Sequence, residues 1–557
     1  MDELLSLRRV RFAYRGGRGP ALDGVDLSVG PGEFVGVMGA TGAGKSTLLR
    51  AAAGIVPHFY HGAFQGEVTL EGVSIAGRKV ADLAGTIGTL FQDFESQLFS
   101  TNVRLECAFG MENLGLPRRE MQGRIERVAA LVGLSGLMDR EPQSLSGGQK
   151  QRLALASILC LEPQVLLCDE PTTDLDPAGR EEVFGILAKL SQSGRAIVLI
   201  DHETDRLLEA DRLLILDRGR TVAEGRPSEV LADPDRCRRY GIRPPDLFVL
   251  FDKLGLGYRP ASVQEAAALL GREGFSLGAG PARLDRPEPG GEPLIRVENL
   301  EFAYTPGQPA LRRVSLDVRR GDFVAILGQN GSGKTTLVKH LSALLPCQSG
   351  RVLYEGQTVD RIGTAGMARR IGFVFQNPDH MLFAANVFEE VSFGLRNLRP
   401  GEDPGPRVSQ ALETVGLAGM EALDPFVLPK GERQKLAVAC VVALEPEVLI
   451  LDEPTTGLDA REQEAMMDLL TRLNRAGHTI IIVTHTMSAV LSYARRVVLM
   501  EGGRIIADGP TREVFHCPDL LAQASLVAPP CVRLSGLLGG RALTVGELAG
   551  ELAKEAR

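Results

Sequence analysis

The sequence predicts an α/β protein made of two similar domains in tandem, each with a buried parallel sheet. One observation is Gly328–Thr335, a glycine-rich run ending in Lys-Thr that follows the apolar segment Phe323–Leu327 and precedes a helical pattern. Another is that Gly39–Ser46 repeats this arrangement after Phe34–Met38. Because later segments also recur in the same order, we interpret the chain as a duplicated domain. Its 557 residues, 44% of them hydrophobic, suffice for two large cores.

Both glycine-rich runs match the P-loop, the turn that cradles phosphate groups between a strand and a helix. Glycines let the backbone fold around the anion, and the helix N-terminus adds amide donors and a positive dipole end. In the usual division of work, Lys334 reaches the β and γ phosphates while the Thr335 hydroxyl binds Mg²⁺. The candidate nucleotide-binding residues of the two loops are Gly39, Gly42, Gly44, Lys45, Ser46, Thr47, Gly328, Gly331, Gly333, Lys334, Thr335 and Thr336.

Composition excludes several classes of protein. The longest uncharged apolar runs, such as Ala196–Ile200, suit buried strands and fall short of the roughly 20 residues that span a bilayer, so we expect no membrane crossing. The N-terminus lacks the basic and apolar regions of a secretory signal. A net charge of -8 gives no general attraction for nucleic acid, and we expect no nucleic-acid partner.

The N-terminal segments predict a strand pair and an aromatic wall. Alternating apolar residues in Val10–Tyr14 and Val25–Val29 favour an antiparallel hairpin beside the P-loop strand. Tyr14 ends the first of these strands, and Tyr304 holds the same place in the second half. A single strand tyrosine is most often structural, but the recurrence favours a ring that stacks on adenine.

Three further motifs follow along each half. Gln92 and Gln376 each follow a short apolar strand. Leu145–Arg152 reads Leu-Ser-Gly-Gly-Gln-Lys-Gln-Arg and leads into a helical pattern, so that a serine and two glycines at a helix start can receive phosphate oxygens. The apolar strands that end at Asp169 and Asp452 each continue into a glutamate. With these motifs the chain resembles the ATP-binding cassette (ABC) family, for which the Leu-Ser-Gly-Gly-Gln signature is diagnostic.

This resemblance implies two ABC ATPase domains, each with an antiparallel β subdomain, a helical subdomain and a small helical C-terminal extension. ATP and Mg²⁺ are the implied cofactors, with a glutamate polarising the attacking water and a histidine contacting the γ-phosphate. The implied catalytic residues are Glu170, Glu453, His202, His485, Gln92 and Gln376. The implied magnesium ligands, some acting through water, are Ser46, Thr335, Asp169, Asp452, Gln92 and Gln376. The implied signature contacts to nucleotide are Ser146, Gly147, Gly148 and Gln149.

The repeat also divides the chain. We assign residues 1–230 to the first ABC ATPase domain and 231–270 to its helical extension. Residues 271–293, rich in glycine and proline, read as a mobile linker. Residues 294–515 form the second ABC ATPase domain and 516–557 the second extension. Because the linker is too flexible to fix the geometry, we predict that the two extensions pack against each other.

The segments after Gln92 and Gln376, and the Pro-Pro pairs of the extensions, are similar to those of energy-coupling factor (ECF) ATPases. Those ATPases drive uptake of B vitamins, their precursors, or cobalt and nickel ions. The resemblance implies a peripheral protein on the cytoplasmic face of the cell membrane, with a membrane scaffold (T) subunit and a small substrate-binding (S) membrane subunit as partners. The two halves are expected to form an internal pseudo-dimer that holds each ATP between one P-loop and the other half's signature.

Three alternatives stay open at this point. Tandem sugar-importer ATPases typically depart from the P-loop pattern in the second half, whereas Lys334 and Thr335 keep it here. A cassette translation factor typically has a long charged helical linker, while residues 271–293 are short and rich in glycine and proline. A DNA-repair cassette carries coiled-coil or zinc insertions, and none is evident in the sequence.

Comparison of the two halves leads to two functional hypotheses, one on docking segments that they share and one on signatures that differ. Residues 94–109 and 377–393 place apolar residues beside acidic ones, so we expect surface loops that dock basic helices of the scaffold; the acidic residues are Glu106, Glu389 and Glu390. The second signature reads Leu-Pro-Lys-Gly-Glu, in which Pro429 removes a hydroxyl and an amide donor and Lys430 replaces a glycine. We therefore expect the ATP site of the first P-loop to be the slower one.

Overall fold

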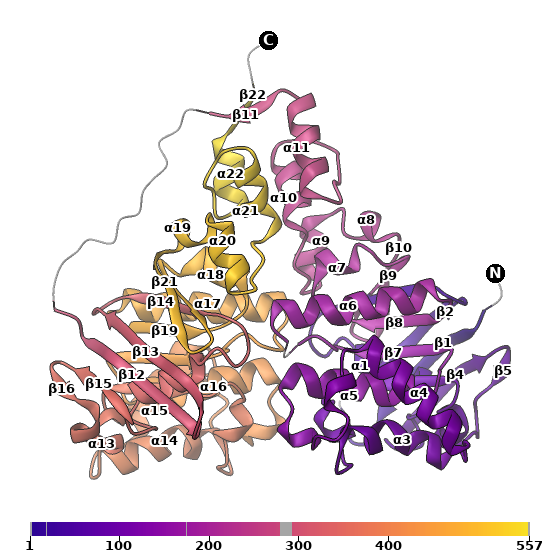
Figure 1. Ribbon diagram of the computed structural model, residues 1–557, viewed down its shortest axis with the longest axis horizontal. Coiled ribbons are helices and arrows are strands. Elements are labelled where there is room, and N and C mark those ends of the chain that lie inside the picture. Colours follow the sequence, from indigo (N-terminus) through magenta and orange to yellow (C-terminus); the bar gives the residue numbers. More distant parts are fainter. Residues whose placement is uncertain (1–2, 18, 174, 279–291, 555–557) are drawn as a thin grey trace. The chain divides into compact units, whose positions relative to one another are not determined.

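The chain divides into two units, Met1–Val249 and Leu250–Arg557, in the computed structural model (Figure 1). The division falls within helix α10 (Asp246–Lys253). The structure describes residues 3–17, 19–173, 175–278 and 292–554. Residues 279–291 of the predicted linker therefore lie outside the described residues, as does Asp174 of the loop next to the first catalytic strand. The five-segment division of the chain stays a prediction.

Two sheets form the framework of the first unit, counted over its described residues. Its strands are β1 (Leu5–Tyr14), β2 (Leu22–Val29), β3 (Phe34–Met38), β4 (Gly62–Leu70), β5 (Val73–Ser74), β6 (Ile87–Leu90), β7 (Val165–Asp169), β8 (Ala196–Ile200), β9 (Arg212–Asp217) and β10 (Arg220–Gly225). An antiparallel sheet has the order β2-β1-β4-β5, which confirms the predicted hairpin. The other sheet has the order β10-β9-β3-β8-β7-β6 and is parallel except for β10.

The central strand β3 shows why this second sheet is covered on both faces. Its five residues are all buried, as expected for a continuous apolar run in a parallel sheet. Phe34 and Met38 belong to the apolar cluster shared with the helices that follow β6, whereas Val35 and Val37 belong to the cluster shared with the antiparallel sheet. Alternate side chains thus join the sheet to a separate core on each face.

The helices of the first unit cover these faces. They are α1 (Lys45–Ala52), α2 (Val80–Leu83), α3 (Val103–Asn113), α4 (Arg118–Leu131), α5 (Gly147–Leu159), α6 (Pro177–Gln192), α7 (Thr204–Leu207), α8 (Pro227–Val230) and α9 (Pro234–Arg239). Helices α3, α4 and α5 pack on one another and make up the helical subdomain. Because β3, β7 and β8 are neighbouring parallel strands, the segments that follow them meet at one edge of the sheet.

The second unit repeats this plan. Its strands are β11 (Phe275–Leu277), β12 (Ile295–Thr305), β13 (Gln308–Val318), β14 (Phe323–Leu327), β15 (Ser349–Tyr354), β16 (Gln357–Thr358), β17 (Ile371–Val374), β18 (Val448–Asp452), β19 (Thr479–Val483), β20 (Arg496–Glu501), β21 (Arg504–Pro510) and β22 (Leu552–Lys554). Its helices are α11 (Val263–Arg272), α12 (Lys334–Leu341), α13 (Val359–Ala368), α14 (Val387–Leu398), α15 (Gly405–Val415), α16 (Lys430–Val442), α17 (Ala460–Arg475), α18 (Met487–Tyr493), α19 (Thr511–Phe515), α20 (Pro518–Gln523), α21 (Pro530–Leu537) and α22 (Val545–Glu551). The sheet orders β13-β12-β15-β16 and β17-β18-β19-β14-β20-β21 match those of the first unit.

The predicted packing of the extensions is confirmed within the second unit. Strand β11, which lies in the segment predicted to be a mobile linker, pairs antiparallel with β22 near the end of the chain, from Phe275 opposite Lys554 to Leu277 opposite Leu552 (Figure 1). Helix α11 packs against α21, and the side chain of Leu277 lies against Gly540. Residues far apart in the sequence are thus joined by both backbone hydrogen bonds and apolar contact.

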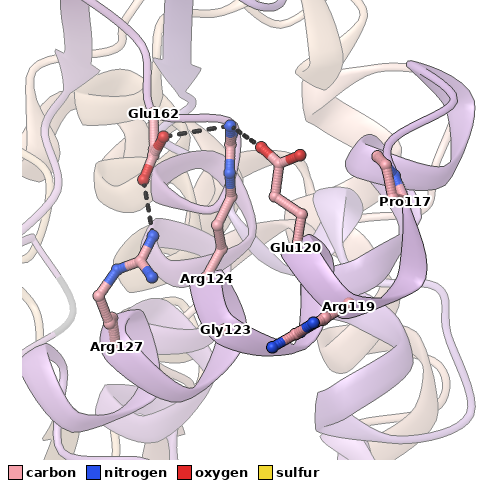
Figure 2. A pocket seen from close by; sticks show the side chains of 7 residues that line it. All are labelled: Pro117, Arg119, Glu120, Gly123, Arg124, Arg127 and Glu162. Carbon is pink, nitrogen blue, oxygen red and sulfur yellow. Dashed lines mark hydrogen bonds and ion pairs between the residues drawn. The ribbon is translucent and has the colours of Figure 1, made fainter.

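A cavity of about 500 Å³ on the helical subdomain of the first unit is lined by ion pairs (Figure 2). Arg124 of α4 bridges Glu120 at 2.7 Å and Glu162 at 3.2 Å, and Arg127 reaches Glu162 at 3.1 Å. In the second unit Glu445 follows α16 as Glu162 follows α5, and it forms an ion pair with Arg407 of α15 at 2.6 Å. The recurrence indicates a structural role, in which these pairs fasten one helix to the end of the next.

Candidate functional site

The P-loop lysines are buried and held by carbonyl groups of their own loops. Lys45 Nζ donates to the carbonyl oxygens of Gly39 and Ala40 at 2.8 and 3.0 Å. Lys334 Nζ donates to those of Gly328 and Gln329, both at 2.8 Å. Helices α1 and α12 begin at these lysines, so that each helix N-terminus opens directly into its loop. The two loops are therefore the same anion-binding construction.

Glycine is required at the ends of these loops. Gly39 has a φ of +146°, and a Cβ there would lie 2.2 Å from the carbonyl oxygen of Leu216; at Gly328 it would lie 2.2 Å from that of Met500. A Cβ at Gly44 would meet the carbonyl oxygen of Ala21 at 2.4 Å. The loops therefore reach their shape only without side chains at these positions.

The predicted magnesium ligands come together in each half. Ser46 donates to Asp169, and Thr335 Oγ1 donates to Asp452 Oδ2 at 2.8 Å. Burial raises the pKa of both aspartates to about 6, and the hydroxyl hydrogen bonds oppose this shift only in part. Within the described residues, Oδ1 of each aspartate is buried and has no hydrogen-bond partner. A buried carboxylate oxygen beside a hydroxyl suits a hard cation such as Mg²⁺, so these residues fit the implied metal.

The predicted catalytic carboxylates are each paired with the predicted histidine. Glu170 Oε1 lies 3.0 Å from His202 Nε2, and Glu453 Oε1 lies 2.9 Å from His485 Nδ1. Burial by itself would raise the pKa of Glu170, but the hydrogen bond and charge of His202 outweigh it and lower that pKa to about 2. Glu170 in turn raises the pKa of His202 in spite of its burial. The pKa of Glu453 is also lowered, because the charge and hydrogen bond of His485 overcome burial.

Both glutamates have left-handed backbones, with φ of 48° at Glu170 and 50° at Glu453. Such a conformation is strained for a residue with a long side chain and is found where a site holds that side chain in place. The second pair is also the better shielded. The side chains of Glu453 and His485 are 7% and 5% exposed, whereas those of Glu170 and His202 are 11% and 25% exposed.

The two glutamines differ between the halves. Gln92 Nε2 donates to Glu170 Oε2 at 2.8 Å, which places it beside the first catalytic carboxylate. Gln376 is exposed, and among the described residues no hydrogen bond joins it to Glu453. The structure thus brings one of the two predicted glutamines to its predicted neighbour.

Two functional residues escaped the sequence analysis. Thr173 Oγ1 donates to Glu170 Oε2 at 3.2 Å, and Thr456 Oγ1 donates to Glu453 Oε2 at 3.4 Å. Each threonine closes a Pro-Thr-Thr run directly after the Asp-Glu pair in both halves. That exact repetition next to the catalytic acids was the signal that could have revealed them.

The predicted aromatic walls stand next to the P-loop helices. Tyr14 OH lies 3.1 Å from Thr47 Oγ1, and Tyr304 OH lies 3.3 Å from Thr336 Oγ1. Each threonine follows the hydroxyl residue of the predicted magnesium site by one position. This hydrogen bond holds the ring of each tyrosine beside the P-loop, where the ring can contact the base of a bound nucleotide.

The two signature segments are built differently. Ser146 caps helix α5: its Oγ accepts from Gln149 N at 3.3 Å, and Gln149 Oε1 accepts from Ser146 N at 3.1 Å. Gly147 and Gly148 form the first turn. Pro429 stands at the same position before α16 and supplies no side-chain cap. The Lys430 ammonium lies against Gly457, where an added Cβ would come within 2.2 Å of it.

Comparison with known proteins agrees with this site. The ABC transporter family model matches residues 22–173 and 311–456. An ABC transporter ATP-binding protein of Caldanaerobacter subterraneus subsp. tengcongensis is 42% identical over 98% of both chains. One of Methanosarcina acetivorans is 40% identical over 97% of this chain and 92% of its own. CbiO1 of Clostridium perfringens, described as part of the ABC transporter complex CbiONQ, is 37% identical over 45% of this chain and all of its own, with a TM-score of 0.39. The chain belongs to the ABC transporter family and is an ABC ATPase with two tandem ATP-binding domains.

Proposed function

We propose that the chain is the ATP-hydrolysing subunit of an ECF-type importer, which powers uptake of a vitamin, a vitamin precursor or a transition-metal ion through separate membrane subunits. The observation that carries this proposal is an exposed aromatic pair that lies in the same place in both halves, in the segment after the predicted glutamine. Its repetition supports a paired docking surface rather than a chance exposure of apolar side chains.

In the first half this surface is formed by Phe99 and Phe109, which are 61% and 43% exposed. Their rings meet edge to face with centroids 4.4 Å apart. Beneath them Glu106 is 2% exposed, and its Oε2 accepts from the amides of Phe99 and Ser100 at 3.0 and 2.8 Å. A buried carboxylate thus fixes the backbone that presents the aromatic ring.

The second half repeats this arrangement. Phe383 and Phe393 are 61% and 50% exposed, with centroids 4.8 Å apart. Glu390 is 4% exposed and accepts from the amides of Phe383 and Ala384, both at 2.7 Å. The expectation that Glu106 and Glu390 lie on the surface is therefore wrong, because both carboxylates are needed as acceptors for loop amides. Glu389 forms an ion pair with Arg396 at 2.5 Å. The docking partner is thus expected to offer apolar side chains rather than basic ones.

Hydrolysis follows from the paired glutamates and histidines. ATP and Mg²⁺, when bound, supply the phosphoryl group and neutralise its oxygens. Glu453 is fixed by His485 and Thr456 and stays ionised, so it can accept a hydrogen bond from the attacking water. A carboxylate with a lowered pKa is a weak proton acceptor, which favours orienting and polarising the water over complete proton removal. In the proposed pseudo-dimer, Ser146 completes this site from the other half.

The location of the protein is part of the proposal. None of the helices in the described residues is long and apolar enough to cross a membrane. We infer a peripheral position on the cytoplasmic face, where the aromatic pairs contact a membrane scaffold subunit. The paired extensions support the internal pseudo-dimer, since helix α11 of the first extension packs against α21 of the second.

The test is to separate transport from hydrolysis. Membrane subunits that co-purify with the chain are identified by mass spectrometry, and the complex is placed in vesicles. The variant with Phe383→Ser and Phe393→Ser is expected to lose uptake while ATP affinity stays unchanged. Phe393 is chosen because Phe388 is half-buried against the core, so its replacement would also affect folding. The control is Phe59→Ser, which alters a 74% exposed phenylalanine outside this segment. Normal uptake and assembly in the double variant would contradict the proposal.

A further inference from the structure

The two tyrosines beside the P-loops are held to different degrees. Tyr304 is 60% exposed; its ring meets Phe302 edge to face at 4.9 Å, and its hydroxyl bonds to Thr336. Tyr14 makes the equivalent contacts, with Phe12 at 4.8 Å and with Thr47, but it is half-buried. Additional neighbours in the first half account for the difference in exposure.

These neighbours are Arg50 and Tyr60. Arg50, in the last turn of α1, donates from its NH1 to Tyr14 OH at 3.1 Å. Its guanidinium also lies over the ring of Tyr60, 4.8 Å from the centroid. The Tyr60 ring meets that of Tyr14 at 6.3 Å with an interplanar angle of 83°. The half-buried guanidinium of Arg50 thus contacts both Tyr14 and Tyr60, and its charge also acts on the buried carboxylate of Asp169.

Tyr60 belongs to a segment that is longer in the first half. Gly66 and Gly350 occupy the same place, since a Cβ at either would lie 2.5 or 2.3 Å from the carbonyl oxygen of Arg9 or Asn299. The chain from Pro57 to Gly66 is longer than that from Pro346 to Gly350. The extra residues carry Tyr60 to Tyr14 and have no counterpart in the second half.

The longer segment also extends the sheet. Strand β4 pairs with β1 as far as Gly62 opposite Tyr14, and Arg15 N donates to His61 O at 3.0 Å. Strand β15 pairs with β12 only as far as Ser349 opposite Glu301, so Tyr304 lies beyond the paired region. The backbone of Tyr14 is therefore paired with β4, whereas Tyr304 lies between residues that are paired with β13. Only in the first half does the β4 segment run alongside the tyrosine.

We propose that Arg50 and Tyr60 are positioning residues that fix Tyr14 as a preformed wall for the nucleotide base, so that the first P-loop holds the base more tightly than the second. The inference rests on the proposed function in that both P-loops bind ATP. A side chain already fixed in its binding conformation loses little freedom when a ligand arrives, which favours affinity without any new contact. Aromatic neighbours at these distances add to the rigidity of the wall.

The experiment uses the full chain with Lys334→Ala, which disables the second P-loop. Binding of Mg·ATP and of Mg·tripolyphosphate is measured by calorimetry in this background, with and without Tyr60→Ala. Tyr60→Ala is expected to raise the Kd for ATP about three- to tenfold and to leave that for tripolyphosphate unchanged, because tripolyphosphate has no base. Arg50→Lys, which copies Lys339 of the second half, is expected to give a smaller rise in the same direction.

Two controls separate positioning from general damage. In a Tyr14→Ala background, Tyr60→Ala is expected to have no further effect on ATP affinity, since the wall is already gone. In a Lys45→Ala background, Lys339→Arg is expected to leave ATP affinity unchanged, since the second half has no counterpart of Tyr60. Equal losses for ATP and tripolyphosphate, or an undiminished effect of Tyr60→Ala without Tyr14, would overturn the inference. Binding of tripolyphosphate but not ATP by the unaltered chain would instead overturn the proposed function.

Discussion

The proposed catalytic carboxylate of the first half, Glu170, accepts a hydrogen bond from a glutamine and contacts a partly exposed histidine. That of the second half, Glu453, is almost fully buried together with its histidine. The signature segments favour the first half instead, because a serine caps helix α5 whereas a proline without a capping side chain precedes α16. If each ATP meets one half's P-loop and the other half's signature, the enclosed carboxylate and the intact signature serve the same ATP. The comparison teaches that each half keeps groups that the other does not: the first has the glutamine and the capped signature, and the second has the more enclosed carboxylate.

The largest effect is expected from removing the catalytic carboxylates one at a time. Glu453→Gln should lower steady-state ATPase activity by about 10²-fold or more and stop uptake, because in the proposed pseudo-dimer this carboxylate acts together with the intact signature. Glu170→Gln should leave a measurable fraction of both, since in the proposed pseudo-dimer its ATP faces Pro429. The rates are compared in the assembled complex. Equal losses, or a larger loss in Glu170→Gln, would break the comparison.

A variant that restores the second signature tests whether the signature accounts for the difference between the two ATP sites. In the Glu453→Gln background, changing Pro429→Ser together with Lys430→Gly should raise the residual ATPase rate about tenfold, because a hydroxyl and an amide donor return to the signature. The new serine is followed at the third position by Glu432, which forms a capping box and should raise the Tm slightly. Ser146→Ala in the Glu170→Gln background is the matched control and should lower the rate. A more stable double variant with no gain in rate would show that the signature does not limit the first site.

The next prediction concerns the proposed docking segments, which are built alike in the two halves. Glu106→Ala and Glu390→Ala each leave two loop amides without their acceptor, so each should lower the free energy of unfolding by about 2–3 kcal/mol. Glu→Gln at either position keeps one acceptor oxygen and should cost less. Urea unfolding followed at several wavelengths measures both pairs. A cost confined to one half would mean that the loops are not equivalent.

A smaller effect is expected from Asp201, which is fully buried next to His202 and accepts from Thr172 Oγ1 at 2.6 Å and from Glu203 N at 2.9 Å. Burial raises its pKa to about 6, above the 3.8 of a free aspartate. Its contribution to stability is therefore complete below pH 3.8 and is lost as the pH rises through 6.

Asp201→Asn removes this titration while keeping an acceptor. The Tm of the unaltered chain should fall between about pH 4 and 6 relative to that of the variant, by an amount that corresponds to at most about 3 kcal/mol. The lowered pKa of Glu170 acts between about pH 2 and 4.5, mostly below this window, and it is present in both proteins. The second half has Thr484 at this position, so Thr484→Val serves as the control and should show no such pH dependence. Parallel curves for Asp201→Asn and the unaltered chain would contradict the assignment.

The sequence was sufficient for the fold and for the residues that short motifs define. A P-loop needs glycines at fixed spacing because a Cβ at Gly39 or Gly328 would collide with a neighbouring strand, and such local necessity leaves a readable pattern. The aspartate and glutamate after β7 and β18 were readable for a related reason, since two acids after a buried apolar strand require partners.

Other features depend on contacts between distant segments. Glu106 looks like a surface acid in the sequence, and only the folded loop shows that two amides need its carboxylate. Arg50 and Tyr60 have no motif, because their role depends on a longer loop returning to Tyr14. Pairing of short strands such as β11 and β22 is likewise set by the docking of helices α11 and α21 rather than by the residues in the strands themselves.

The pairing of β11 with β22 has a consequence for how the protein is made. Leu277 leaves the ribosome long before Leu552, roughly 15–55 s earlier at 5–20 residues per second. The whole second cassette is synthesised between the two strands, so this small sheet closes last and only on a chain that has been completed. Nascent or truncated chains can fold each cassette but leave the apolar face of α11 uncovered, which marks them for chaperones and proteases. The joint between α11 and α21 can thus form only after both cassettes have been synthesised.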